Sequence, residues 1–256
     1  MKIATYNVNG IRARLERLTE WLTETRPDVA CLQEIKCQNE GFPLADIEAA
    51  GYHALVHGQK GFNGVAILSK QRAESVRIGL DGEPEDEMAR YIEADVGGLR
   101  VASIYLPNGN PQPGPKFDYK LRWMERLRAR AVELIALEIP VVLAGDYNVI
   151  PSDADIANPK AMADDALMQP ESRAAFRRIC TQGWTDALRQ IHPTGPLWTF
   201  WDYQAGAWQR DAGFRIDHLL LSPEAADRLV DAGVDKDHRA REKASDHAAT
   251  WVVLRN

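Results

Sequence analysis

Short apolar runs recur along the whole chain, and polar side chains are concentrated where these runs stop. The acidic, amide and imidazole residues at the ends of the runs are, in chain order, Asn7, Asn9, Glu34, Asp146, Asn148, Asp217, Asp246 and His247. Apolar runs this short predict buried β-strands. Because a rigid scaffold carries functional side chains on the segments that leave its strands, we predict that several strand ends meet at one polar site.

Both hairpins and helical crossovers are predicted between the strands. Gly97 and Gly98 separate the runs ARYIEADV and LRVASIYL, which indicates a hairpin. Further strands are expected in KIATYNV, VACLQ, GYHALVHG, GVAILSK, AESVRIG, PVVLAG, FRIDHLLLS, RLVDAGV and ATWVVL. Helices are expected over residues 11–24, 44–50, 116–138, 171–181 and 184–190. The mixture excludes a purely parallel sheet and predicts an α/β fold of two mixed sheets packed face to face, with helices outside.

The longest predicted helix, over residues 116–138, has an apolar face and a basic face. Its apolar stripe consists of Phe117, Leu121, Met124, Leu127, Ala131 and Leu134. Arg122, Arg126 and Arg130 recur at a spacing of four residues, with acidic residues between them. Rows of mixed charge are typical of a helix face in water, so we expect these arginines to be solvated.

The composition fits one domain inside the cell. The 256 residues can bury a large core and show no repeat or low-complexity segment, so we expect a single domain, 1–256. No apolar stretch is long enough for a membrane span, and the first residues lack a signal sequence. Three cysteines without a CxxC spacing, one of them Cys31 in an apolar run, predict reduced thiols and a cytoplasmic protein. The net charge of −6 argues only weakly against a nucleic-acid partner, because a carboxylate cluster raises the negative count.

The polar residues at the strand ends fit the hydrolysis of a phosphodiester. Asn9, Glu34 and Asp246 offer oxygen ligands for Mg²⁺, for which Mn²⁺ is a substitute. Asp146, steadied by Asn148, is suited to orient and deprotonate an attacking water. Taken alone, Glu34 is explained as a solvated carboxylate and Asp146 as an Asx turn at a strand end. Together they favour a metal-dependent phosphodiesterase.

The imidazole of His247 and the phenol of Tyr105 are two further candidate groups for binding the phosphate. His247, supported by Asp217, is expected to donate to the phosphate from the side opposite the metal. Tyr105, at the end of LRVASIYLP, offers its hydroxyl to the same phosphate. Taken alone, a structural histidine and a packed strand aromatic are the ordinary explanations of these two residues.

Several motifs occur in a characteristic order along the chain. They are YNVNGIR at the start, LQE at 32–34, GVAILSK, IYLPN at 104–108, GDYNV at 145–149, WTFW at 198–201, FRIDHLLLS and SDH. In this order they resemble the exonuclease III family of apurinic/apyrimidinic endonucleases, which belongs to the endonuclease/exonuclease/phosphatase superfamily. The resemblance implies a four-layered α/β sandwich like that of deoxyribonuclease I, with the site at one edge of the two sheets.

The resemblance also implies an activity. It implies Mg²⁺-dependent cleavage on the 5′ side of abasic sites in duplex DNA by a monomer, with Mn²⁺ as a substitute. Activities at blocked 3′ ends, namely 3′-to-5′ exonuclease and 3′-phosphatase or phosphodiesterase, are common in bacterial members. The resemblance leaves two questions open: whether one or two metals act, and whether tyrosine or aspartate directs the nucleophile.

The roles implied by the motifs can be stated residue by residue. Phosphate contacts are implied for Asn7, Tyr105, Asn148 and His247, metal contacts for Asn9, Glu34 and Asp246, water activation for Asp146, and support of the imidazole for Asp217. Asn108, in IYLPN, is assigned to the substrate. An apolar pocket for a bare sugar is implied at Phe200, Trp201, Phe214 and Ile216, with ordinary core packing as the alternative.

Three other functions compete with this interpretation. A sphingomyelinase, an inositol polyphosphate phosphatase or a nonspecific nuclease shares the scaffold, but the aromatic residues of WTFW and FRID favour the abasic-site interpretation. A nucleic-acid-binding regulator without activity would lose the GDxN and SDH residues, and this chain has both. A purely structural protein leaves the polar cluster unexplained.

Overall fold

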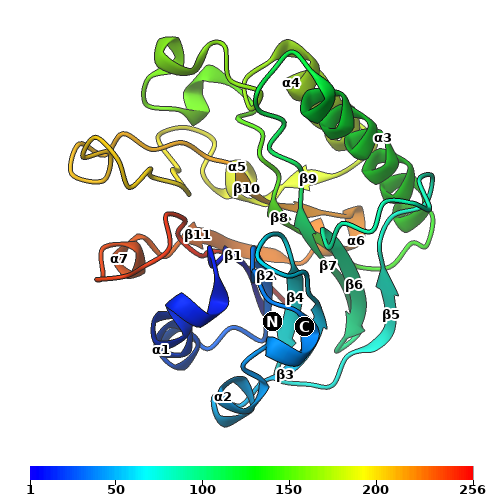
Figure 1. The fold of residues 1–256 in the computed structure, drawn as a ribbon. Helices are drawn as coiled ribbons and strands as arrows, with labels where there is room; N and C mark the ends of the chain where they lie inside the picture. The colour runs from blue at the N-terminus through cyan, green and yellow to red at the C-terminus, as the bar shows by residue number, and fades with distance from the viewer. Residues whose placement is uncertain (256) are drawn as a thin grey trace.

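The computed structural model describes residues 1–255, and within them the strands form two six-stranded sheets (Figure 1). The first sheet has the order β11-β12-β1-β2-β4-β3 and the second has the order β5-β6-β7-β8-β10-β9. The strands of the first sheet are β1 (Lys2–Asn7), β2 (Val29–Gln33), β3 (His53–His57), β4 (Val65–Ser69), β11 (Leu229–Val234) and β12 (Thr250–Leu254). The strands of the second are β5 (Glu74–Ile78), β6 (Tyr91–Val96), β7 (Leu99–Tyr105), β8 (Val141–Asp146), β9 (Thr185–Asp186) and β10 (Asp217–Leu221).

Helices lie outside the two sheets. Figure 1 shows α3 and α4 side by side on the outer face of the second sheet, and α1 and α2 on that of the first. The helices are α1 (Leu15–Thr25), α2 (Leu44–Ala49), α3 (Pro115–Ile135), α4 (Pro170–Cys180), α5 (Ala187–Ile191), α6 (Pro223–Ala226) and α7 (Lys236–Arg239). Short 3₁₀ helices span Ile11–Arg14, Asn39–Gly41, Asp153–Asp155 and Pro159–Met162. Within the described part of the chain, every helix is too short or too polar to cross a membrane.

Side-chain alternation builds three core layers between these elements. In β10, Leu219 and Leu221 pack between the two sheets, whereas Leu220 packs beneath α3 and α4. A third layer, which includes Trp21 and Leu32, lies between the first sheet and its helices. Successive strand residues point to opposite faces, so a strand covered on both sides is apolar throughout. The four-layered α/β sandwich predicted from the sequence is confirmed.

Two parallel strand pairs place the ends of four strands at one edge. β1 pairs with β2 and β7 pairs with β8 in parallel, because α1 and α3 return the chain to its starting side. β10 runs antiparallel to β8 and begins where β8 ends. The resulting register pairs Asp146 with Tyr105 on one side and with Asp217 on the other. Polar residues from distant parts of the sequence thereby reach the same edge.

The long helix differs from its prediction in two respects. It ends at Ile135 rather than at residue 138, and its buried face includes Lys120 and Trp123, while Leu121 is only partly buried. The expectation of a solvated arginine row was wrong for Arg126 and Arg130. Their side chains are only 10% and 13% exposed, because acidic residues of the segment before β6 and of β6 itself lie against this face of the helix. The pairs are Arg126 with Asp86 and Arg130 with Glu93.

Two other boundaries also differ from the prediction. In the run FRIDHLLLS the strand begins only at Asp217, because the preceding residues bridge to another loop through Phe214 and Phe200. The helix expected from Trp184 to Gln190 begins at Ala187, after the short strand β9. Asp186 ends that strand and caps the helix by accepting a hydrogen bond from the backbone N–H of Arg189.

We predict that Gly145→Ala destabilises the protein strongly. A Cβ atom at position 145 would lie 2.1 Å from the carbonyl oxygen of Ile104 in the neighbouring strand. Since strand backbones cannot yield as a flexible side chain does, we expect a loss of about 3 kcal/mol in the free energy of unfolding, measured in urea. The control is Gly51→Ala, where an added Cβ meets nothing within 4 Å and only backbone strain of about 1 kcal/mol is expected. Equal losses in the two variants would contradict the prediction.

Candidate active site

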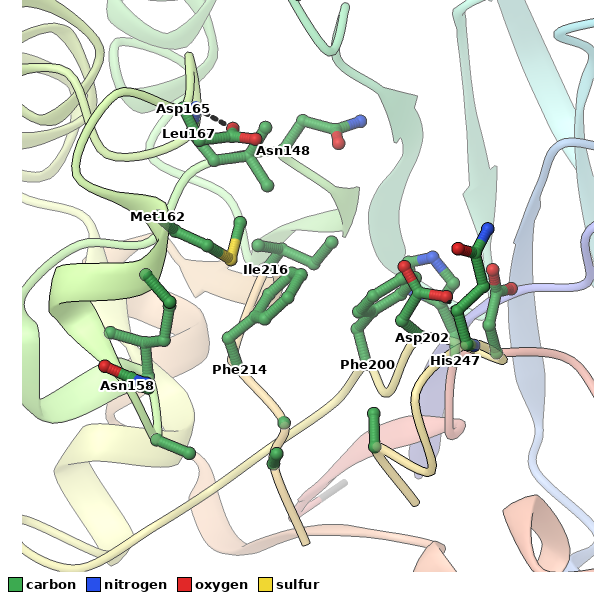
Figure 2. A pocket seen from close by; sticks show the side chains of 18 of the residues that line it. Asn148, Asn158, Met162, Asp165, Leu167, Phe200, Asp202, Phe214, Ile216 and His247 are labelled. Atoms are coloured by element: carbon green, nitrogen blue, oxygen red, sulfur yellow. Dashed lines mark hydrogen bonds between the residues drawn. The ribbon is translucent and has the colours of Figure 1, made fainter. Parts of the chain in front are cut away.

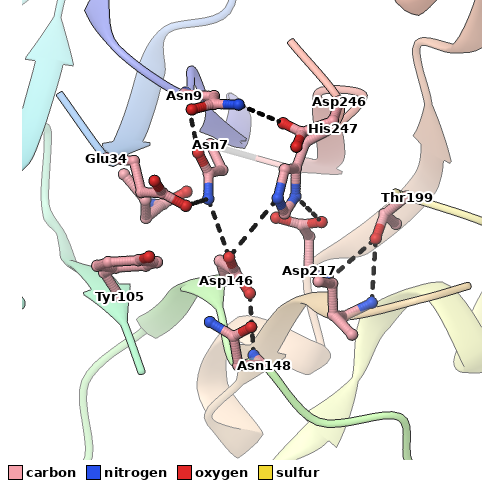
Figure 3. A network of polar contacts seen from close by, with 12 residues as sticks. Asn7, Asn9, Glu34, Tyr105, Asp146, Asn148, Thr199, Asp217, Asp246 and His247 are labelled. Atoms are coloured by element: carbon pink, nitrogen blue, oxygen red, sulfur yellow. Dashed lines mark hydrogen bonds and ion pairs between the residues drawn. The ribbon is translucent and has the colours of Figure 1, made fainter. Parts of the chain in front are cut away.

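The amide of Asn7 connects the two sheets at the site (Figure 3). Its Nδ2 donates to Glu34 Oε1 at 2.9 Å and to Asp146 Oδ2, also at 2.9 Å. Asn7 is the last residue of β1, Glu34 directly follows β2, and Asp146 is the last residue of β8. The predicted meeting of strand ends is therefore present, and Asn7 joins the ends of three strands.

Asp146 lies at the centre of the cluster and is fully buried. Its Oδ1 accepts a hydrogen bond from the backbone N–H of Asn148 at 2.9 Å, so the carboxylate also closes an Asx turn. Burial raises the pKa of Asp146, while the imidazolium of His247 and the amide of Asn7 oppose this increase. A carboxylate with a raised pKa is a stronger base than an ordinary aspartate.

His247 and Asp217 form a buried pair beside Asp146. His247 Nδ1 lies 2.8 Å from Asp217 Oδ2, and His247 Nε2 lies 3.7 Å from Asp146 Oδ2. Burial lowers the pKa of His247, but the charge and hydrogen bond of Asp217 outweigh this effect and raise it above its ordinary value. Thr199 fixes Asp217 from behind, because its Oγ1 accepts from the backbone N–H of Asp217 at 3.1 Å. The imidazole is therefore held as a cation with one nitrogen directed toward the cluster.

Oxygen ligands for a metal gather at the neighbouring corner. Asn9 Nδ2 donates to Asp246 Oδ1 at 3.0 Å, and the Lys36 ammonium contacts both Asn9 Oδ1 and, at 2.8 Å, Glu34 Oε2. Oxygen atoms of Asn9 and Glu34 thus contact the same positively charged group, the ammonium of Lys36. Burial raises the pKa of Glu34, but hydrogen bonds from Asn7 and Lys36 lower it overall, so the carboxylate is ionised. This set of carboxylate and amide oxygens fits a hard divalent cation such as Mg²⁺.

A second grouping of metal-type ligands overlaps this corner. Ligand atoms of Glu34, Asp146 and His247 all lie within 4.8 Å of one another. The sequence placed only Glu34 of these three in the metal set. One oxygen of Glu34, Oε1, and one oxygen of Asp146, Oδ2, both accept a hydrogen bond from the amide of Asn7. The other oxygen of Glu34 contacts the Lys36 ammonium together with Asn9 Oδ1, which favours the corner predicted from the sequence.

Backbone strain is concentrated at the same place. Asn9, Glu34, Lys36 and Asn148 have φ values of 45°, 50°, 53° and 46°, in the left-handed region. Such conformations cost on the order of 1 kcal/mol or more in residues other than glycine, and they persist where the surroundings fix them. The hydrogen bonds of the polar cluster supply this fixation.

A cavity of about 850 Å³ opens beside the polar cluster (Figure 2). Its polar end includes Glu34, Tyr105, Asn108, Asp146, Asn148, Asp246 and His247. Its apolar wall includes Ile156, Met162, Leu167, Phe200, Phe214 and Ile216. The rings of Phe200 and Phe214 pack at a tilt with centroids 4.6 Å apart. The rings of Phe200 and His247 pack edge to face with centroids 5.0 Å apart. The apolar wall therefore begins directly at the imidazole.

Trp201, which the resemblance assigned to the substrate pocket, does not line this cavity. Its side chain is buried on the other side of the segment, where its ring packs against Trp208 with centroids 5.0 Å apart. Its Nε1 donates to Asp211 Oδ1 at 2.9 Å. Phe200 faces the cavity, so the next residue along this extended segment points away from it.

Tyr105 and Asn108 lie at the polar end as predicted. Burial, followed by the negative charges of Glu34 and Asp146, holds the pKa of Tyr105 well above its usual range. Its hydroxyl therefore keeps its proton at neutral pH and acts as a donor. Asn108 Nδ2 donates to Asn148 Oδ1 at 3.2 Å, which links the segments that follow β7 and β8.

Some residues that support the site were not recognised in the sequence. Thr199 holds Asp217, and Lys36 holds the metal corner. A buried polar bridge of Gln33 and Ser103 joins the sheets below the site, with Gln33 Nε2 donating to Ser103 Oγ at 3.0 Å. Lys120 lies behind Asn108 and Asn148. Polar residues inside apolar runs were the available signal for Gln33 and Ser103.

Comparison with known proteins identifies the family. The model of the endonuclease/exonuclease/phosphatase family matches residues 4–247. The chain belongs to this family. Exodeoxyribonuclease III of Haemophilus influenzae is 37% identical over 267 residues, which cover 100% of both chains.

Solved structures of this family agree with the fold. An AP endonuclease from Archaeoglobus fulgidus is 40% identical and superimposes with a TM-score of 0.96 over 100% of both chains. A 3′ phosphatase from Neisseria bound to a product DNA hairpin is 38% identical, with a TM-score of 0.97 over 100% of both chains. The predicted enzyme class, a phosphodiester hydrolase of the exodeoxyribonuclease III and AP endonuclease type, is confirmed.

We predict that Asp217→Asn lowers the pKa of His247. The variant keeps a polar side chain but removes the charge that raises this pKa, so it should fall toward the ordinary value of about 6.5. As the pH rises, His247 of the variant would therefore lose its positive charge at a lower pH than His247 of the wild type. The measurement is an NMR titration of the His247 ring in the DNA-free protein, with the signal assigned by comparison with His247→Ala. An unchanged titration would refute the role given to Asp217.

Proposed function

We propose that this nuclease hydrolyses the phosphodiester on the 5′ side of abasic sites in duplex DNA and cleans blocked 3′ ends in a Mg²⁺-dependent reaction. The observation that carries the proposal is the contact between a buried carboxylate–imidazole cluster and an apolar wall. Phe200 touches His247 in this contact, so the cavity combines a phosphate site with space for a bare sugar. The similarity to an AP endonuclease and to a 3′ phosphatase bound to a DNA hairpin supports both activities.

Asp146 is the proposed base. It accepts a proton from the attacking water, whose oxygen forms a bond to phosphorus while the bond to the 3′ oxygen breaks. The departing 3′ oxygen takes a proton from a solvent water and becomes a 3′-hydroxyl. The Asn148 N–H and the Asn7 amide hold the two oxygens of this carboxylate, which fixes its orientation. Because burial raises its pKa, Asp146 is better suited to take a proton near neutral pH. Tyr105, which remains protonated, donates to the phosphate instead.

His247 stabilises the charge that develops on the phosphoryl oxygens. As an imidazolium it donates through Nε2, since Nδ1 is held by Asp217 at 2.8 Å. Fixed donors in a site shielded from water stabilise developing charge more than water does, because they need no reorganisation. Asn148 adds one amide N–H to the same region, because its other amide N–H donates to the carbonyl oxygen of Leu106. Both amide N–H groups of Asn7 already bind Glu34 and Asp146, so Asn7 acts by holding these carboxylates at the phosphate site.

Asn9, Glu34 and Asp246 are the residues that would hold the metal. When bound there, the ion supplies positive charge for the phosphate and the departing oxygen. Lys36 lies on the same oxygens and is part of the electrostatic environment of that corner. All three ligands are of the hard oxygen type, which favours Mg²⁺ or Mn²⁺ over softer metals.

The apolar wall is the proposed discriminator between damaged and intact DNA. An abasic nucleotide is turned out of the duplex cheaply because it has no base to unstack. Phe200, Phe214 and Ile216 offer a surface for its sugar, next to His247. A nucleotide that carries a base would have to place polar base edges against this surface. We infer that Trp201 acts only as support for this wall.

The function is tested with a labelled duplex that contains one tetrahydrofuran site. We expect one cut directly 5′ to the site and much slower cleavage of an intact duplex and of the single strand. Asp146→Asn should lower the rate at least ~10²-fold, the usual scale for a lost general base, with the fold intact by circular dichroism. Release of phosphate from small esters without cleavage of DNA would favour a phosphatase of another substrate class.

Metal dependence is tested separately. We expect EDTA to abolish cleavage, and Mg²⁺ or Mn²⁺ to restore it. Glu34→Gln removes one negative charge from the metal corner and should raise the Mg²⁺ concentration needed for half-maximal rate by roughly tenfold or more. The control is Glu74→Gln, an exposed carboxylate on β5 away from the cavity, which should leave that concentration unchanged. Equal requirements in both variants would remove Glu34 from the metal site.

A further inference from the structure

Lys120, on α3, is fully buried behind the polar end of the cavity. A lysine is rarely buried without partners that compensate for the loss of water. Here Nζ donates to two backbone carbonyl oxygens, that of Asn108 at 3.0 Å and that of Asn148. Both of these asparagines line the cavity. One side chain therefore joins the segment that follows β7 to the segment that follows β8.

Asn148 needs external support to hold its conformation. Its φ of 46° lies in the left-handed region, which asparagine tolerates better than most residues but still at some cost. Its backbone N–H donates to Asp146, and its carbonyl accepts from Lys120. Its side-chain amide donates to the carbonyl oxygen of Leu106 at 2.9 Å. Lys120 thus secures one side of a residue whose other side holds the proposed base.

The segment around Gly109 is shaped to admit the lysine. A Cβ atom at Gly109 would lie 2.6 Å from Lys120 Cδ and 3.2 Å from Ala166 Cβ. The φ of Gly109 is +93°, which also favours glycine. The aliphatic part of Lys120 therefore fills the space that a side chain at this position would need.

The contacts of Lys120 do not require a fixed charge. Burial lowers its pKa to about 7, while Asp146 and Asp165 favour the charged form. An amine keeps N–H donors whether or not it carries the extra proton. The two carbonyl oxygens are therefore satisfied in either state.

We propose that Lys120 is a positioning residue for the hydrolysis. Through the carbonyl groups of Asn108 and Asn148 it fixes the two segments so that the Asn148 side chain lies beside Asp146. Asn108 Nδ2 and Asn148 Oδ1, 3.2 Å apart, are aligned by the same support. Lys120 touches no substrate. The inference rests on the proposed function because it assigns Asn148 to the scissile phosphate.

The first test is Lys120→Met, which keeps the length of the side chain and removes its donors. We expect kcat to fall by ~10²-fold with KM nearly unchanged, because small displacements of reacting groups slow the chemical step more than binding. Lys120→Arg restores a donor and should have a higher kcat than the methionine variant. Both the abasic duplex and a recessed 3′ end serve as substrates.

The matched control is Arg130→Met on the same helix. Arg130 is a partly buried cation, 13% exposed, and it pairs with Glu93 of β6. It lies about 15 Å along the helix from Lys120. Its loss should lower stability and leave kcat unchanged. In NMR spectra, the backbone and side-chain amide signals of Asn148 should shift in Lys120→Met and stay in place in Arg130→Met. The NMR comparison of the two variants distinguishes a change in the position of Asn148 from a general loss of stability. It does not require the protein to cleave DNA.

A double variant identifies the route of the effect. If Lys120 acts through Asn148, then adding Lys120→Met to Asn148→Ala should cost little beyond Asn148→Ala alone. If Lys120→Met does not fold, Gly109→Ala is used in its place, because the added Cβ displaces the lysine stem; its kcat should also fall.

Several results would overturn the inference. They are a folded Lys120→Met with kcat within about threefold of the wild type, multiplicative losses in the double variant, or Asn148 signals that do not move. Failure of the wild type to cut either DNA substrate would instead refute the proposed function, and the NMR comparison would still decide whether Lys120 positions Asn148.

Discussion

The register between three neighbouring strands of the second sheet is the constraint on which the site depends. Tyr105 in β7 and Asp217 in β10 both pair with Asp146 in β8, so the three side chains form a row on one face. A shift of one residue would turn the row to the opposite face of the sheet. The close approach of Gly145 to the carbonyl group of Ile104 secures this register, because a side chain there would separate β7 from β8.

Burial of this row determines the electrostatics of the site. Charges interact more strongly in a buried site than in water. Asp217 raises the pKa of His247, and the resulting imidazolium opposes the effect of burial on the pKa of Asp146. Asn7 and Lys36 add a donor and a positive charge around Glu34. The cluster is therefore less repulsive to an anionic phosphate than its number of carboxylates indicates.

The sequence predicted the strand ends well because apolar runs define both a strand and its last residue. Asp146 was expected after PVVLAG and is the last residue of β8. The side to which Trp201 points could not be predicted, because WTFW lies in an irregular segment outside any named strand. A lysine in an amphipathic helix is normally assigned to solvent. The burial of Lys120 depends on carbonyl groups of two segments that are distant in sequence, which no local pattern reveals.

The residues at the polar end of the cavity and those of its apolar wall are supported by different kinds of structure. The proposed catalytic residues are therefore held independently of the residues proposed to select the substrate. The polar end rests on strand ends, whereas the apolar wall rests on the loops between β8 and α4 and between α5 and β10. Arg215, in the loop between α5 and β10, forms an ion pair with Asp155, in the loop between β8 and α4, at 2.8 Å. It forms a second ion pair with Asp186, the last residue of β9, at 2.7 Å. Burial raises the pKa of Asp155, but Arg215 holds it well below its usual range, so the ion pair persists at physiological pH. Because this anchor lies outside the row of Asp146, residues of the wall can change without disturbing the register that the chemistry needs.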